Sequence, residues 1–260
     1  MALHLGGSWA RGRVRTDGRR LYWWRETLTV LTIYLVYSLV RNASEGSVSV
    51  AFSHARWLMR AQEALGINVE ETLQDWALDV PGLIVAMNYI YGSLHFVVTT
   101  FAIVYLFRRF GDDYPLWRNT LAVTTVLALV GFVTWPLMPP RLLPEGYGFV
   151  DTLARYPTFW SFDSGAIQEV SNQYAAMPSL HFAWALFCAC ALGPRVAGRA
   201  WRLAAAGYPA LTLAAIVLTG NHFILDAAGG AAVFGLGYLI AGRFTRAAGL
   251  RGGDAADGEG

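Results

Sequence analysis

Long apolar runs alternate with polar loops along this chain. The runs cover residues 25–41, 82–106, 119–138, 178–193, 203–220 and 223–242. A transmembrane helix needs about 20 mostly apolar residues, and these segments meet that length approximately. The pattern therefore predicts an all-α fold: a polytopic membrane protein with a bundle of six transmembrane helices.

Composition supports the same interpretation, because the chain is 55% hydrophobic and only 15% charged, unlike an ordinary soluble domain. We divide it into a basic N-terminal segment (1–24), a catalytic membrane domain (25–246) and a disordered tail (247–260). The aromatic trio Tyr22-Trp23-Trp24 suits a membrane interface, and no convincing cleavage site follows the first apolar run. We therefore expect an uncleaved membrane anchor.

All basic residues are arginines, and they cluster before the first apolar run and after the second, fourth and sixth. Loops that stay in the cytoplasm carry the excess of basic residues. The pattern predicts a multi-pass protein of the plasma (inner) membrane with both termini in the cytoplasm. The loops 42–81 and 139–177 would then lie on the extracytoplasmic face.

Residues 48–66 have the periodicity of an amphipathic helix in the first outer loop. Ser53, Arg56, Arg60 and Glu63 share one side, and Val50, Trp57, Leu58, Ala61 and Leu65 share the other. Such a helix lies along the membrane interface or packs on the bundle as a lid with no role in chemistry.

The second apolar run carries a polar stripe with helical spacing. Asn88, Tyr91, His95 and Thr99 recur every three or four residues, so they would face the protein interior or water. Asn88, Tyr91 and His95 are candidates for lining a substrate cavity. Interhelical hydrogen bonding explains Asn88 and His95 equally well.

Two segments at the outer face contain groups suited to binding phosphate. Pro139-Pro140-Arg141 ends the third run with an arginine, whose planar fork makes paired hydrogen bonds to phosphate. In Pro178-Ser179-Leu180-His181, proline suits a first helical turn, and Ser179 with the free amides beside it would form a positive helix end. Alternatively, Arg141 extends to lipid headgroups and His181 is an interfacial histidine.

The last run begins with Gly220-Asn221-His222-Phe223-Ile224-Leu225-Asp226, which places a histidine and a carboxylate on one helix face. A carboxylate that accepts the proton on one imidazole nitrogen leaves the other nitrogen as a base or nucleophile. A hydrogen bond that only stabilises the bundle is the structural alternative.

We expect no metal and no cofactor. His181, His222 and Asp226 could together ligate one ion, but no two histidines have the close spacing of zinc enzymes. Cys188 and Cys190 are interpreted as small buried residues. The partners we expect are a phospholipid or lipid phosphate substrate and the membrane, not a nucleic acid.

Three motifs taken together resemble those of the type 2 phosphatidic acid phosphatase superfamily: Pro-Pro-Arg at 139–141, Pro-Ser-Leu-His at 178–181 and His-x-x-x-Asp at 222–226. Spacing and context are more similar to the branch that contains fungal inositol phosphorylceramide synthase. The resemblance implies that His222 is the nucleophile, Asp226 its orienting partner and His181 the general acid. It also implies that Arg141 and Ser179 bind the substrate phosphate.

The sequence departs from the broader superfamily pattern in lacking two cations. No lysine precedes Arg141, and position 216, where an arginine is expected, is Ile216. One obvious arginine suits a phosphodiester better than a doubly charged monoester, unless Arg155 or another group supplies charge. We therefore favour a lipid phosphotransferase that moves a headgroup, for which phosphoinositol is the candidate, to an alcohol.

Two alternatives remain. A lipid phosphate or polyprenyl pyrophosphate phosphatase would use the same residues with water as the acceptor. A transporter or structural membrane protein could use the polar stripe and the His–Asp pair to line a permeation path.

Overall fold

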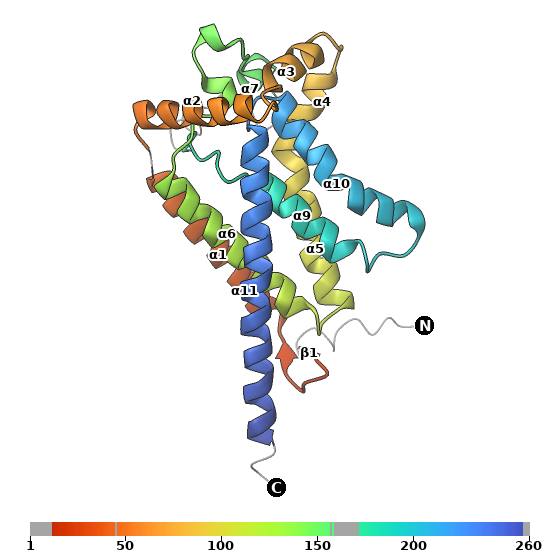
Figure 1. Ribbon diagram of the computed structural model, residues 1–260. Coiled ribbons are helices and arrows are strands. Elements are labelled where there is room, and N and C mark those ends of the chain that lie inside the picture. The colour runs from red at the N-terminus through yellow and green to blue at the C-terminus, as the bar shows by residue number, and fades with distance from the viewer. Residues whose placement is uncertain (1–11, 45, 157, 159–171, 257–260) are drawn as a thin grey trace.

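A computed structural model describes residues 12–44, 46–156, 158 and 172–256, and side chains as far as residue 246. The chain is mostly helical, and its long helices pack side by side (Figure 1). Helices cover all six predicted segments. They are α1 (Trp23–Ala43), α4 (Leu83–Tyr89) continued by a π-helical turn η1 (Ile90–Leu94) and α5 (His95–Arg109), α6 (Tyr114–Thr134), α9 (Leu180–Leu192), α10 (Arg199–Leu218) and α11 (Ile224–Ala256).

Four of these helical stretches are long and apolar enough to cross a membrane within the described residues. They are Leu83–Arg109, Tyr114–Thr134, Arg199–Leu218 and Ile224–Arg246. Helix α9 is apolar but shorter, and α1 is long enough but carries charges at both ends. Length and composition thus support a multi-pass membrane protein.

The shorter elements gather at the two ends of the bundle. At one end lie α2 (Val48–Ala64), α3 (Glu70–Leu78), α7 (Thr152–Arg155) and the 3₁₀ turns η2 (Pro140–Leu142) and η3 (Glu145–Tyr147). At the other end, β1 (Arg13–Val14) and β2 (Arg20–Leu21) form a small antiparallel pair beside the loop between α5 and α6 (Figure 1).

The amphipathic helix predicted at 48–66 is present as α2, but its buried side differs from the prediction. Ala51, Ala55, Leu58 and Gln62 are buried, whereas Trp57 is 57% exposed. Because Ala51 and Ala55 are small, α2 packs closely against the apolar cluster that includes Leu137 and Phe223. Larger apolar side chains such as Trp57 therefore lie on the exposed side of the helix. Helix α2 lies across the end of the bundle (Figure 1).

Helix α11 packs along α6 and α9, and glycines make these contacts possible. A Cβ on Gly230 would clash with the carbonyl oxygen of Ser179, and one on Gly229 would press on Pro178. Small residues of this kind permit close helix approach. Helix α11 also continues to Ala256, past the predicted boundary at 246, and residues 257–260 of the predicted tail lie outside the described part.

We predict that Gly230→Ala lowers the melting temperature, since the added methyl must displace the start of α9. Overpacking of this kind costs about 1–3 kcal/mol. Gly235→Ala is the matched control, because a Cβ there meets no heavy atom within 4 Å. Alanine should stabilise that helical position by roughly 0.5–1 kcal/mol. Thermal denaturation in detergent checks both variants, and a Gly230→Ala protein as stable as Gly235→Ala would contradict the packing.

Candidate active site

The segments that contain Arg141, His181 and His222 meet at the end of the bundle where α2, α3 and α7 lie. The three side chains line one cavity of about 650 Å³. Backbone hydrogen bonds join the segments: Arg141 N donates to Gly220 O over 2.8 Å, and Ser179 N donates to Asp226 O over 2.9 Å. Residues far apart in sequence are thereby fixed around one space.

His222 and Asp226 form the pair that their spacing predicted. His222 Nδ1 lies 3.3 Å from Asp226 Oδ2, and the same oxygen accepts the backbone N–H of Phe223 over 2.9 Å. Both side chains are buried. The carboxylate can therefore hold a proton on Nδ1, which leaves Nε2 as the nitrogen with a free lone pair.

His181 lies opposite His222 among aromatic rings. Its ring centroid is 5.7 Å from that of His222 and 4.3 Å from those of Tyr91 and His95. Tyr91 belongs to the π-helical turn η1, a local irregularity that often occurs at functional sites. Two imidazoles therefore face the same cavity, where both can act on one bound group.

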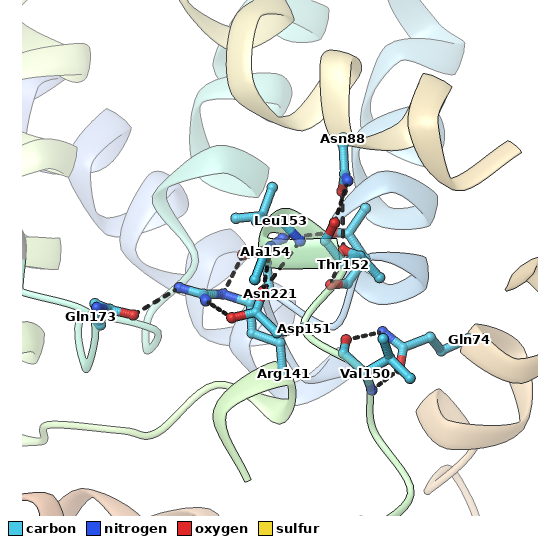
Figure 2. Close-up of polar contacts among 11 residues, drawn as sticks. Gln74, Asn88, Arg141, Val150, Asp151, Thr152, Leu153, Ala154, Gln173 and Asn221 are labelled. Carbon is cyan, nitrogen blue, oxygen red and sulfur yellow. Dashed lines mark hydrogen bonds and ion pairs between the residues drawn. The ribbon is translucent and has the colours of Figure 1, made fainter. Parts of the chain in front are cut away.

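Arg141 is held rigidly by three side chains (Figure 2). Its Nε donates to Asn221 Oδ1 (3.1 Å), and its two terminal nitrogens donate to Asp151 Oδ2 (2.8 Å) and Gln173 Oε1 (3.3 Å). Asp151 also caps α7 through the amides of Leu153 and Ala154. A guanidinium has five N–H donors, so two remain for an anion in the cavity.

The remaining predicted site residues divide into two groups. Tyr91 and His95 line the cavity. Ser179 instead caps α9 by accepting the amide of Phe182, and Asn88 bonds to Thr152 in α7 (Figure 2). Neither Ser179 nor Asn88 lines the cavity, so phosphate binding by Ser179 stays a prediction.

Two residues of α2 and α3 support the His222–Asp226 pair in a way that the sequence did not indicate. Glu70 Oε1 accepts the amide of Ile224 over 2.8 Å, and Gln62 Oε1 accepts that of Leu225 over 3.0 Å. A helix leaves its first amides without partners, and these side chains supply them for α11.

The metal alternative gains no support from the geometry. Within the described ranges, no three His, Cys, Asp or Glu side chains gather as a set of ligands. Asp226 Oδ2 faces His222 Nδ1 and the Phe223 amide.

Comparison with known protein families identifies the superfamily of this chain. The sequence profile of the PAP2 superfamily matches residues 56–240, which include all three motifs. The chain belongs to the PAP2 superfamily. Members of this superfamily are phosphatases and phosphotransferases, so the chain has an enzymatic activity of that general type. No curated protein and no solved structure matches it.

We predict that Asp226→Asn lowers turnover of a lipid phosphoester roughly 10³–10⁴-fold, as expected when an amide no longer fixes the histidine tautomer. Asp112→Asn changes an exposed carboxylate near β1 and serves as the control. Initial rates of the purified proteins, with melting temperatures to confirm folding, check the prediction. Near-normal turnover by Asp226→Asn would show that this carboxylate does not orient His222.

Proposed function

We propose that this protein is an integral-membrane lipid phosphotransferase that moves a phospho-headgroup between a lipid and an alcohol through a phosphohistidine. The His222–Asp226 pair opposite His181, at the cavity that Arg141 lines, carries the proposal. Phosphoryl transfer needs a positioned nucleophile, hydrogen-bond donors for the phosphoryl oxygens and an acid for the leaving oxygen. These residues can supply each of them.

In the first step, Nε2 of neutral His222 attacks phosphorus and an N–P bond forms. The bond from phosphorus to the leaving lipid oxygen breaks, and protonated His181 gives its proton to that oxygen. In the second step, the hydroxyl of the acceptor alcohol attacks phosphorus, the N–P bond breaks and His181 recovers a proton. Arg141 would stabilise charge on the phosphoryl oxygens in both steps.

The charge of the site favours a phosphodiester donor. Asp151 lies 2.8 Å from Arg141 and offsets part of its charge, and Ile216 is fully buried in the core. A phosphodiester carries one negative charge, whereas a monoester carries nearly two. A site with few uncompensated cations is therefore better suited to headgroup transfer than to hydrolysis of a monoester. By resemblance to the inositol phosphorylceramide synthase branch, phosphoinositol is the headgroup we propose.

A second space suits the hydrocarbon part of such a donor. An apolar groove of about 840 Å³ runs between α1, α5 and α6 and shares Tyr34, Phe96 and Trp184 with the active-site cavity. A lipid whose phosphate lies near His222 could place its chains in this groove. A cavity with polar residues that adjoins an apolar groove supports a lipid as the substrate.

For the membrane arrangement, we propose six crossings by α1, α4–α5, α6, α9, α10 and α11, with α2 at the outer interface. The arginine distribution supports termini in the cytoplasm and a cavity on the extracytoplasmic face of the plasma (inner) membrane. Helix α7 and the start of α11, which adjoin the cavity, lie at the opposite end of the bundle from β1 (Figure 1), in agreement with this arrangement.

We predict that the purified protein in detergent forms a new lipid from a labelled phosphoinositide when a lipid alcohol is present. His222→Ala should abolish this product, because no nucleophile remains. His54→Ala changes a histidine that stacks on Trp135 outside the cavity, so this variant should retain activity. Release of free phosphate from a lipid phosphate would indicate a phosphatase, and absence of His222-dependent turnover would exclude both enzymatic functions.

The role of His181 as the acid predicts a dependence on the leaving group. His181→Ala should slow transfer from an alkyl phosphodiester by about 10²–10⁴-fold, the usual contribution of general acid catalysis. A nitrophenyl ester should be affected far less, since nitrophenolate leaves without a proton. Parallel rates for the two esters check this. Equal losses for both would assign His181 a role other than proton donation.

A further inference from the structure

Arg41 brings a second arginine to the active-site cavity from a helix that the family match does not include. It lies in the last turn of α1 and lines the same cavity as Arg141, His181 and His222. The PAP2 match begins at residue 56. Arg41 therefore belongs to the part of this chain that precedes the matched segment.

The guanidinium of Arg41 has donors to spare. One terminal nitrogen donates to the backbone oxygen of Asn172 over 3.1 Å. Among the described residues, no carboxylate lies within salt-bridge distance of it, whereas Arg141 pairs with Asp151 at 2.8 Å. As far as the described residues show, the charge of Arg41 is thus less compensated than that of Arg141.

The end of α1 is fixed where Arg41 meets the cavity. Asn172 Nδ2 donates to Ser44 O over 2.6 Å, and Asn172 Oδ1 accepts the amide of Tyr174 over 2.9 Å. Asn172 is buried and itself lines the cavity. An arginine that only extended to lipid headgroups would not need this anchoring.

We propose that Arg41 is a second phosphate-binding residue, which holds the monoanionic phosphodiester of the donor lipid together with Arg141. This inference rests on the proposed function and deepens it. Arg155 is no substitute, because its guanidinium lies over the ring of Tyr156, 5.5 Å from the centroid, and does not line the cavity. Arg41 thus supplies charge that the sequence motifs lack.

The test measures phosphate binding separately from catalysis. Dimethyl phosphate, a soluble phosphodiester, is titrated into purified protein by calorimetry, and the KM and kcat for a short-chain phospholipid donor are measured in parallel. Arg41→Gln should weaken dimethyl phosphate binding and raise KM by roughly tenfold to a hundredfold, the value of a charged hydrogen bond. Arg25→Gln removes the same charge from the other end of α1, where the guanidinium contacts Tyr22 and Trp24, and should change neither.

Arg41→Lys separates phosphate binding from a structural role. Lysine keeps the charge but not the fork, so the proposal expects affinity between those of the wild type and Arg41→Gln, with an unchanged melting temperature. If Arg41→Gln does not fold, the lysine variant decides alone, and a several-fold loss of phosphate affinity supports the proposal.

If Arg41→Gln folds and binds dimethyl phosphate as tightly as the wild type, Arg41 does not bind phosphate. If Arg41→Gln does not fold, wild-type affinity of Arg41→Lys for dimethyl phosphate has the same consequence. A loss of kcat and melting temperature without a change in phosphate affinity would also overturn the role of Arg41. Because binding is read without turnover, failure of the transferase hypothesis would appear as normal phosphate binding with no new lipid.

Discussion

The segment that leads into α11, residues 220–226, holds the other two motifs of the candidate site in place. Arg141 N donates to Gly220 O, and Ser179 N donates to Asp226 O, so the first two motifs are bonded to the backbone of this segment. Gly220 has a φ of +66°, and a Cβ there would meet Gln74 and Arg141. The turn that brings the motifs together thus requires glycine at this position.

The same helix start explains how two carboxylates can be buried in an apolar bundle. Asp226 and Glu70 are 0% and 1% exposed, and a buried charge is costly unless it is paired or hydrogen-bonded. Asp226 accepts the amide of Phe223 and Glu70 that of Ile224, at the positive end of the helix dipole. One oxygen of each still has no partner among the described residues. The His222–Asp226 pair therefore depends on a group of polar contacts whose burial the rest of the bundle must stabilise.

Structural features that depend on the local spacing of residues could be predicted from the sequence. Apolar runs located the helices, and the four-residue spacing of His222 and Asp226 predicted their contact. Contacts between distant segments could not be found in this way: nothing near Glu70 indicates that it binds the amide of Ile224. The prediction of which face of α2 is buried was wrong in part for a similar reason. Close packing of Ala51 and Ala55 excluded larger apolar residues from that face. Arg41 was counted only as the end of a membrane segment, although it lines the cavity.

The position of Arg41 suggests that the charge of the candidate site can change without a change in the packing around its histidines. Helix α1 has no fully buried residue and packs mainly on α6, whereas the histidines lie on the tightly packed α9 and at the start of α11. A residue on α1 can therefore change with little effect on the packing that aligns His222 and His181. Its charge can still reach an anion bound near these histidines, because both arginines line the same cavity. Under the proposed function, the matched PAP2 segment supplies the two histidines and Arg141, and α1 adds a second arginine from outside that segment.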